Sequence, residues 1–162
     1  MILFYAKSRS YYFNIRAVPV ARSETRSNHM RRAVDSDGRT YRSIMSGGRE
    51  YRYYDDEPTY PGDVWDDIST CSRRTPAHRL ETQKPLKLLQ RIVSCASQPG
   101  DLVCDLFAGS GTTAVAAAQL DRRFVCVDRS PLAISVAGKR LNQTMQDATF
   151  HFAYDVEAPC GP

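Results

Sequence analysis

The stretch 101–113, near the middle of the chain, constrains the fold more than any other. It reads DLVCDLFAGSGTT, so a short apolar run ends on Asp105 and is followed at once by a turn of small residues, AGSG at 108–111. Glycine admits positive φ and lets a ligand approach the main chain, and the N–H groups that open the next helix are directed at that ligand. The stretch therefore predicts a strand, a ligand-binding glycine loop and a helix.

Three classes of ligand use such a turn. A phosphate-binding P-loop ends in Gly-Lys-Ser/Thr, whereas this turn runs into Thr112 with no lysine. A dinucleotide fingerprint is satisfied by Gly109, Gly111 and Ala114, with the acid Asp128 roughly 20 residues further on. The spacing alone leaves a dinucleotide and S-adenosylmethionine open.

Asp105 helps to separate these two ligands. A carboxylate four residues ahead of the first glycine would repel a bound pyrophosphate, and it would attract the ammonium and sulfonium groups of S-adenosylmethionine. The sign of the charge favours S-adenosyl-L-methionine as the cofactor.

Length and composition restrict the class of protein. A chain of 162 residues, 42% hydrophobic and 25% charged, is ordinary for one soluble domain with a real core. The opening MILFYA is too short for a signal peptide, and no later run approaches the ~18 apolar residues of a membrane span. The five cysteines contain no C-x-x-C pair, so neither a zinc site nor a disulfide framework is indicated. We expect a cytoplasmic protein with no membrane association and no metal.

The positive charge lies in the first half of the chain. Residues 1–80 hold 14 Lys and Arg, of which 13 are arginine, against 10 Asp and Glu, whereas the remainder holds 8 against 8. Eight of the nine tyrosines lie by residue 60 and alternate with arginines, as in YRYY at 51–54. Basic residues mixed with aromatics predict a DNA-contacting insert over 16–60. The alternative is a loop-rich extension whose arginines are solvated, and the acidic run at 55–57 argues against a uniformly basic groove.

The rest of the pattern predicts alternating strands and helices. Residues 1–6 and 11–15 read as extended, and 16–60 as loop-rich with turns at 36–38 and 46–48. A helix is expected to open at 82–85, with an apolar stripe of Leu86, Leu89, Ile92, Val93 and Ala96. A buried helix follows at 112–120, and then a strand at 124–127 that is covered on both faces. The last expected elements are a helix at 130–142 and a third strand at 148–154. Cys104 and Cys126 are expected in buried strands. This order is half of a doubly wound α/β sheet.

Three segments in this order resemble the C-terminal part of the site-specific DNA amino-methyltransferases in which the cofactor motifs follow the catalytic ones. They read ETQKPLKLLQRIV at 81–93, PGDLVCDLFAGSGTTAVAAAQL at 99–120 and RRFVCVDRSPLAI at 122–134. The match is dense across 61–141, and ILFYAKSRSYYFN at 2–14 resembles the strand region that precedes the target-recognition segment of the same family.

The resemblance implies an α/β fold: a partial Rossmann-like, S-adenosylmethionine-dependent methyltransferase sheet with a loop-rich N-terminal insert. It assigns to the cofactor pocket Asp105, Phe107, Ala108, Gly109, Ser110, Gly111 and Thr112, with Asp128 at the ribose and Thr82, Gln83 and Lys84 at the methionine end. Phe107 as a core residue and Lys84 as a solvated residue at a helix start are the alternatives. The implied division is 1–15 as a strand region of the sheet, 16–60 as the target-recognition insert and 61–162 as the cofactor-binding region.

The catalytic turn of this family has no counterpart in the chain. These enzymes hold a flipped-out base against an Asp/Asn/Ser-Pro-Pro-aromatic turn, but the 162 residues contain no Pro-Pro pair. The nearest imitation, EPTY at 57–60, follows the recognition region instead of preceding it. We therefore expect no catalytic residue here, and an enzyme truncated at its N-terminus or one half of a split enzyme.

Two hypotheses remain. The first is a methyltransferase of adenine N6 or cytosine N4 in double-stranded DNA, with a separate chain carrying the catalytic turn. The second is a non-catalytic cofactor- or DNA-binding remnant. A free-standing small-molecule methyltransferase fits less well, because its cofactor motif usually precedes its substrate-binding region.

Overall fold

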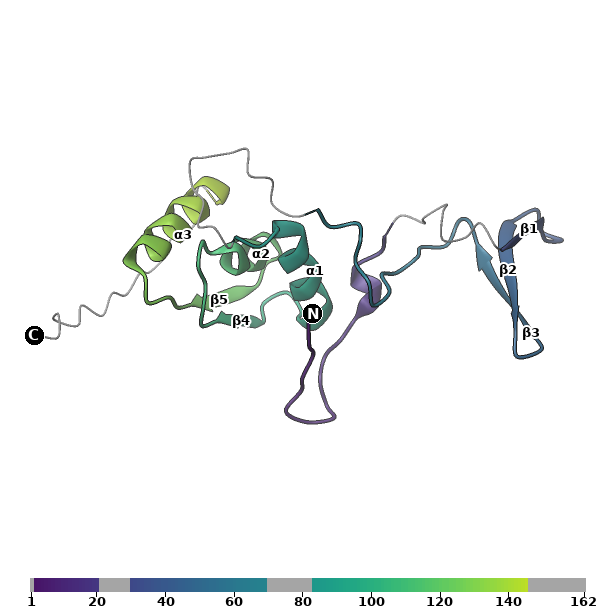
Figure 1. Ribbon diagram of the computed structural model, residues 1–162, viewed down its shortest axis with the longest axis horizontal. Coiled ribbons are helices and arrows are strands. Elements are labelled where there is room, and N and C mark those ends of the chain that lie inside the picture. The colour runs from purple at the N-terminus through teal and green to yellow at the C-terminus, as the bar shows by residue number, and fades with distance from the viewer. Residues whose placement is uncertain (1, 21–29, 70–82, 146–162) are drawn as a thin grey trace, which may run out of the picture.

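The computed structural model describes residues 2–20, 30–69 and 83–145. In chain order the elements are η1 (Ile15–Ala17), β1 (Arg31–Val34), β2 (Thr40–Ser46), β3 (Arg49–Tyr54), α1 (Leu86–Ala96), β4 (Leu102–Asp105), α2 (Thr112–Gln119), β5 (Arg123–Cys126) and α3 (Pro131–Thr144). Figure 1 shows two groups of elements, the helices with β4 and β5 on one side and the sheet β1–β2–β3 on the other.

The α/β group is a strand, glycine loop, helix and strand in the order that the sequence predicts. Strands β4 and β5 are parallel, with Val103 opposite Phe124 and Asp105 opposite Cys126. A parallel pair needs a crossover connection, which α2 supplies. Helix α3 begins as expected: the Ser130 hydroxyl accepts a hydrogen bond from the Ala133 N–H, and proline occupies the first turn.

Helix α2 is the centre of the core. It contacts α1, α3 and both strands, and its residues 114–118 are between 0% and 6% exposed. Half of its sequence, TTAVAAAQ, is alanine, which lets neighbouring elements approach closely. The expectation of a buried helix here is confirmed.

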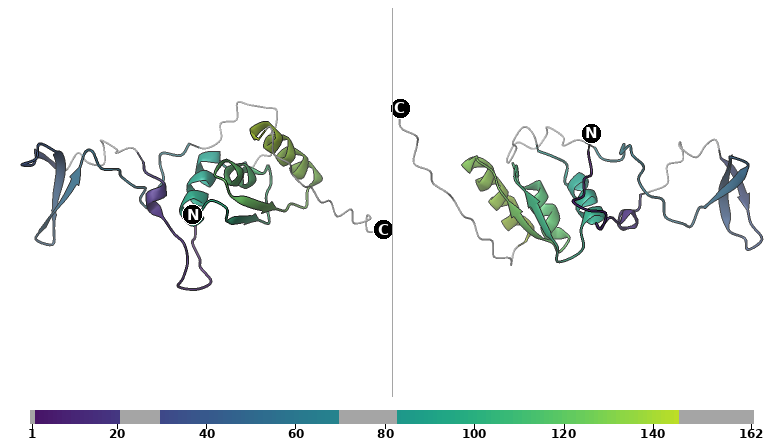
Figure 2. Two further views of the ribbon diagram at one scale, coloured as in Figure 1. Left: turned by 180° about the vertical axis from the view of Figure 1, so that it is seen from behind. Right: turned by 90° about the horizontal axis from the view of Figure 1, so that it is seen from below.

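Among the described residues, the strands β4 and β5 are covered on one side only. All three helices lie on the same side of the strand pair (Figures 1 and 2), and exposure alternates along both strands. Leu102 is 57% exposed and Val125 is 48% exposed, while Phe124 and Cys126 pack on α2. The expectations that strand 124–127 is covered on both faces and that Cys104 is buried are therefore wrong for the described residues, since covering the second face requires elements that the described residues do not supply.

Helix α1 begins after Pro85, which occupies the N-cap position. The predicted stripe is correct in part, because Val93 is buried and Leu86 packs against the core. At the C-terminal end the prediction is one position off: Cys95 is 4% exposed, whereas Ala96 faces solvent. This end of the helix also contacts the segment before η1, because the Asn14 N–H donates to the Cys95 carbonyl at 2.8 Å.

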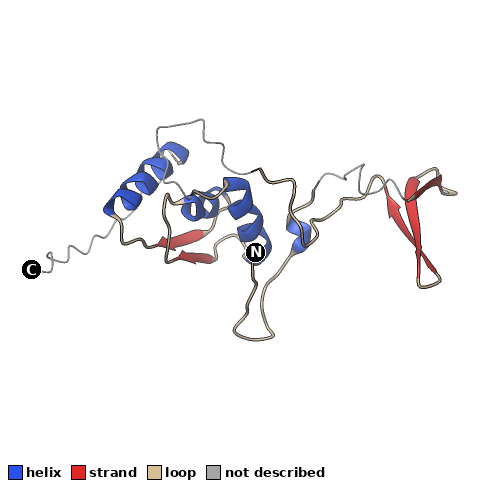
Figure 3. Ribbon diagram, viewed as in Figure 1, coloured by secondary structure: helices blue, strands red, loops and turns tan. Residues whose placement is uncertain are grey.

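Residues 31–54 form a three-stranded antiparallel sheet, where the sequence predicted only loops (Figure 3). Both predicted turns are present. Gly38, with φ of 80°, lies in the turn between β1 and β2, and Gly47 and Gly48, with φ of 58° and 77°, form the two-residue connection between β2 and β3. The strands escaped prediction because both faces of this sheet are rich in polar side chains, so the alternation of apolar and polar residues is weak.

Residues 2–14 contain no strand, which corrects the local expectation for 1–6 and 11–15. A strand needs a neighbour to complete its backbone hydrogen bonds, and β4 and β5 do not pair with this segment. Instead Phe4 packs against Tyr11 and Phe13, with 5.3 Å between ring centroids in each pair. The strand expected at 148–154 lies outside the described residues. Within the described ranges, no helix is both long and apolar enough to cross a membrane.

Candidate cofactor-binding site

The loop between β4 and α2 is anchored by the acid that ends β4. One carboxylate oxygen of Asp105 accepts the Phe107 N–H at 3.0 Å, and the other accepts the Thr113 hydroxyl at 2.5 Å. These two bonds hold the carboxylate between the start of the loop and the first turn of α2. Thr113 was not among the predicted site residues. Its place directly after Gly111 and Thr112, at the start of the expected helix, is the sequence signal that could have identified it.

The glycine loop is also tied to the end of β5. The Ala108 N–H donates to the Val127 carbonyl at 2.9 Å, and the Gly109 N–H donates to Oδ2 of Asp128 at 2.8 Å. The second oxygen of Asp128 accepts the Ser130 N–H at 2.9 Å. Each carboxylate oxygen can accept more than one hydrogen bond, so Asp128 keeps acceptor capacity for a ligand hydroxyl. The predicted residues Asp105, Gly109 and Asp128 therefore belong to one connected structure.

The two glycines of the loop serve different purposes. Both have positive φ, 53° at Gly109 and 72° at Gly111. A Cβ placed on Gly109 would meet nothing within 4 Å, whereas one on Gly111 would lie 2.6 Å from the Cβ of Ala137 on α3. Gly109 leaves open space for a ligand, and Gly111 permits close packing of α3 against the loop.

Ser110 and Thr112 turn their side chains away from that open space. Both are buried, at 4% and 5% exposure, and both bond to Arg140 of α3. The guanidinium donates to the Ser110 carbonyl at 2.6 Å, to the Ser110 hydroxyl at 2.9 Å and to the Thr112 hydroxyl at 3.0 Å. Sequence reasoning missed Arg140, because nothing local in the α3 sequence indicates a partner in a loop 30 residues earlier.

The remaining predicted residues flank the loop. Phe107 is 90% exposed, so the core alternative for this ring does not hold. Gln83 is half-buried and Lys84 is exposed, and both directly precede α1. Thr82 lies outside the described residues. No group of three or more His, Cys, Asp or Glu side chains could hold a metal ion in the described parts of the chain.

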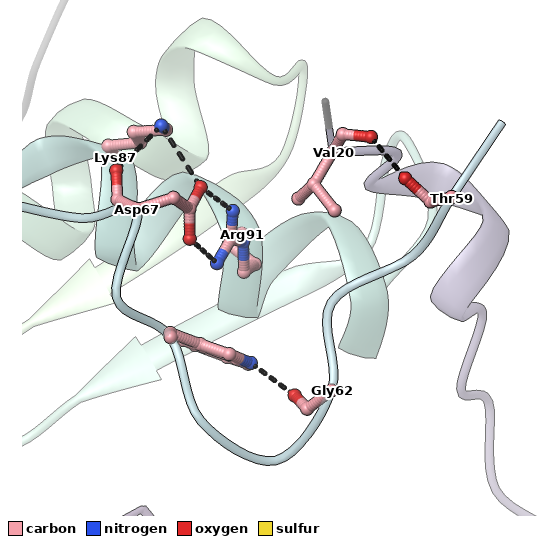
Figure 4. Close-up of polar contacts among 7 residues, drawn as sticks. Val20, Thr59, Gly62, Asp67, Lys87 and Arg91 are labelled. Atoms are coloured by element: carbon pink, nitrogen blue, oxygen red, sulfur yellow. Dashed lines mark hydrogen bonds and ion pairs between the residues drawn. The ribbon is translucent and has the colours of Figure 1, made fainter. Parts of the chain in front are cut away.

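A second set of contacts fastens the segment 60–69 to α1 (Figure 4). Asp67 accepts two hydrogen bonds from the Arg91 guanidinium, at 2.9 and 2.6 Å, and its carboxylate also pairs with Lys87 at 3.2 Å. Hydrogen bonding to Arg91 holds the pKa of the Asp67 carboxyl well below its usual range. The Arg91 guanidinium carbon lies 4.9 Å from the ring centroid of Trp65, whose indole N–H donates to the Gly62 carbonyl. Trp65 is thus an anchor of this segment.

Two hydrogen bonds draw together the ends of the segment that contains β1, β2 and β3. The Val20 N–H donates to the Thr59 carbonyl at 2.8 Å. The Thr59 hydroxyl donates to the Val20 carbonyl at 2.7 Å, as Figure 4 shows. Thr59 lies within the imitation catalytic turn EPTY, so these contacts give that segment a structural role.

The unit of strand, glycine loop, helix and strand, with Asp105 and Asp128 at the ends of its two strands, defines a Rossmann-like nucleotide- or cofactor-binding α/β protein. Comparison with known proteins narrows the class. The sequence model of a family described as DNA methylase matches residues 1–139, and the chain belongs to this DNA methylase family.

Individual relatives agree with the family. The chain is 31% identical over 147 residues to the type II methyltransferase M1.MboII of Moraxella bovis. This alignment covers 88% of this chain and 53% of the relative. It is 42% identical over 79 residues to the type II methyltransferase M2.DpnII of Streptococcus pneumoniae, covering 49% of this chain and 30% of the relative. Among solved structures, the chain is similar to the one described as the crystal structure of the M1.HpyAVI–SAM complex, with 39% sequence identity and a TM-score of 0.40. The matched region covers 41% of this chain and 32% of that one. The chain thus spans about half or less of these proteins.

Proposed function

We propose that the chain forms the cofactor-binding and DNA-recognition part of a methyltransferase that modifies adenine N6 or cytosine N4 in double-stranded DNA. The observation that carries the proposal is the arrangement of Asp105, Gly109 and Asp128 around one loop. A negative charge beside an open glycine suits a positively charged sulfonium donor. S-adenosyl-L-methionine, when bound, supplies the methyl group.

Most of the predicted site residues have a role in this proposal. Asp105 attracts the positive end of the cofactor, Gly109 leaves room for it, and Asp128 accepts ribose hydroxyls while holding the loop. The exposed ring of Phe107 offers a stacking surface, and Thr82, Gln83 and Lys84 close over the methionine end. Ser110 and Thr112 act through Arg140 as positioning residues, since their side chains point to α3.

The acceptor side of the reaction needs a group that the chain does not contain. Transfer to an exocyclic amine requires acceptors that orient the amine toward the methyl group. The 162 residues carry no Pro-Pro turn, so we propose that a polypeptide segment outside them supplies it. The same observation favours the second candidate function, a non-catalytic cofactor- or DNA-binding subunit.

The proposed division of the chain follows the contacts. The bonds between Val20 and Thr59 close off the segment between them, which supports 16–60 as a target-recognition insert. The contacts of Asp67 with α1 support 61–162 as a unit that begins before the helix. The expected place of residues 1–15 in the sheet is left out of this proposal, because residues 2–14 contain no strand.

Calorimetry tests the cofactor assignment. The chain is titrated with S-adenosylmethionine and with NAD⁺, and uptake of the methyl donor alone is expected. Asp105→Asn removes the negative charge and is expected to weaken binding by about tenfold or more. Asp101→Asn is the matched control, because it removes the same charge just before β4, where the carboxylate accepts the Gln98 N–H. Tight binding of NAD⁺ with indifference to the methyl donor would reject the proposal.

A methyl-transfer assay separates the two candidate functions. Unmethylated duplex DNA is incubated with radiolabelled cofactor and the chain, with and without a protein segment that carries an Asp/Asn-Pro-Pro-aromatic turn. Incorporation only in the mixture supports the methyltransferase. No incorporation in either reaction, by a chain that binds the cofactor, supports the non-catalytic subunit.

A further inference from the structure

The sheet β1–β2–β3 has two faces of different chemistry. Directly opposed residues of antiparallel strands share a face, so the pairing register sorts the side chains. The Tyr51/Tyr53 face carries Arg32, Arg42, Ile44, Arg49, Tyr51 and Tyr53. The Tyr41/Tyr54 face carries Arg31, Tyr41, Ser43, Glu50, Arg52 and Tyr54.

The Tyr41/Tyr54 face is satisfied by its own contacts. The Arg52 guanidinium lies 4.7 Å from the ring centroid of Tyr41 and pairs with Glu50 at 2.8 Å. The rings of Tyr41 and Tyr54 are 5.7 Å apart between centroids, and Arg39 lies 3.9 Å from the centroid of Tyr54. Tyr41 is only 8% exposed. This face offers little aromatic surface, and two of its arginines are paired with carboxylates, Arg52 with Glu50 and Arg39 with Asp56 and Glu57.

The Tyr51/Tyr53 face is open and positively charged. Tyr51 is 45% exposed and Tyr53 is 42% exposed. The face carries three arginines, and the alternation along β3 places a single carboxylate, Asp55, at its end. Asp55 pairs with Arg32 at 3.2 Å and with Arg42 at 3.4 Å, so one negative charge is shared between two positive ones. For Arg49, no carboxylate partner is found among the residues described.

We propose that the Tyr51/Tyr53 face is the surface of the insert that lies against the phosphate backbone of duplex DNA, and that the opposite face does not contact it. Arginine binds phosphate oxygens in a bidentate manner, and the phenol hydroxyl of an exposed tyrosine can donate to them. The strands place three arginines on the Tyr51/Tyr53 face and two on the opposite face, and only the first face exposes two tyrosines beside them, so these two differences together give the sheet its orientation. The proposal rests on the proposed function for the class of partner, and it adds the face and the residues.

A pair of double variants with equal loss of charge tests the orientation. Arg32→Gln with Arg49→Gln alters the Tyr51/Tyr53 face, and Arg31→Gln with Arg52→Gln alters the other. Binding of the full chain to a fluorescent duplex is measured by anisotropy at several salt concentrations, without cofactor. The first variant is expected to weaken binding about tenfold or more at low salt and to lower the slope of log K against log salt by about 2. The second is expected to change affinity by less than about twofold.

Tyrosine variants test the aromatic part of the same face. Tyr51→Ala with Tyr53→Ala is expected to weaken binding while leaving the salt slope unchanged, since no charge is removed. Circular dichroism checks that each variant keeps its sheet. If the variant Arg31→Gln with Arg52→Gln unfolds because the Arg52 contacts are lost, single variants replace the double ones. Arg49→Gln then alters the Tyr51/Tyr53 face and Arg31→Gln alters the Tyr41/Tyr54 face, and both side chains are exposed.

Three results would overturn the assignment: equal losses from both faces, a larger loss from the Tyr41/Tyr54 face, or no duplex binding by the unaltered chain. Cofactor uptake is measured separately and distinguishes the two proposals. A chain that takes up S-adenosylmethionine and binds duplex DNA, but not through this face, loses only the face assignment. A chain that binds duplex through this face but ignores the cofactor loses only the proposed function.

Discussion

Arg140 donates to the Ser110 carbonyl at 2.6 Å and to the Ser110 hydroxyl at 2.9 Å, and so joins α3 to the glycine loop. A loop that binds a ligand with its backbone must be held in place before the ligand arrives, because ordering it on binding would cost affinity. A charged donor to a buried carbonyl is a strong means of holding it.

We therefore expect Arg140→Met to weaken S-adenosylmethionine binding about tenfold, since the loop loses three hydrogen bonds from one guanidinium. Calorimetry measures the affinity. Lys139→Met is the control, because Lys139 is the exposed neighbour on the same helix and carries the same charge. Equal affinities of the two variants for S-adenosylmethionine would show that the Arg140 hydrogen bonds do not order the loop.

Substitution of the two loop glycines separates packing from ligand access. Gly111→Ala is expected to lower the free energy of unfolding by about 3 kcal/mol, because strain at positive φ adds to a clash with Ala137. Gly109→Ala is expected to lower it by only about 1 kcal/mol, since the new methyl group enters open space. Urea unfolding measures both values.

Cofactor binding is expected to show more specific damage at Gly109, because that open space is the proposed ligand position. Gly109→Ala then weakens S-adenosylmethionine binding without a matching loss of stability. If the Gly109→Ala variant binds S-adenosylmethionine with unchanged affinity, the cofactor does not occupy the open space beside Gly109.

The contact between Asp67 and Arg91 gives stability that depends on pH. The pKa of the folded Asp67 carboxyl is lowered from the ordinary 3.8, mainly by hydrogen bonding to Arg91. A lowered folded pKa means that the contribution is complete above about pH 4 to 5 and is lost as the pH falls below the unfolded value. Asp67→Asn is expected to cost about 1 to 2 kcal/mol at pH 7, a value reduced for the partial exposure of the carboxylate.

Trp65 fluorescence reports this unfolding directly, because the only tryptophan of the chain lies against Arg91. The difference between Asp67→Asn and the unaltered chain should stay constant from pH 7 to 5 and shrink at lower pH. Asp63→Asn removes the same charge nearby and should show neither effect. A difference that persists undiminished at pH 3 would mean that the carboxylate charge is not its source.

The local part of the fold could be predicted from sequence, because its signals are local. Glycines at 109 and 111, the cap at Ser130 and the alanine-rich run before residue 119 each report on a few neighbouring residues, and the structure contains the elements that they predict. The Asp128 bond to the loop also follows from position, since the ends of adjacent parallel strands meet at one edge of a sheet.

The rest depends on contacts between distant parts of the chain. Whether Leu102 and Val125 are buried is decided by what covers the second face of β4 and β5, and an apolar strand sequence does not say. The pairing of residues 31–54 was hidden for a related reason. Tyrosine and arginine at alternate positions can make a sheet whose faces differ in charge and exposure instead of hydrophobicity, as Tyr51 and Tyr41 illustrate.

Thiol labelling tests the uncovered face of β4 and β5. Cys104 is exposed on that face, whereas Cys126 faces α2 and burial raises the pKa of its thiol to about 11. At pH 8 only about one in a thousand Cys126 thiols would be ionised, so iodoacetamide should modify Cys104 at least about tenfold faster. Mass spectrometry of tryptic peptides separates Cys126 from the other cysteines, and fragmentation of the peptide 92–122 distinguishes Cys104 from the buried Cys95. Slow modification of both cysteines in the native chain, with rapid modification in urea, would show that this face is covered in solution and that the described arrangement of β4 and β5 is incomplete.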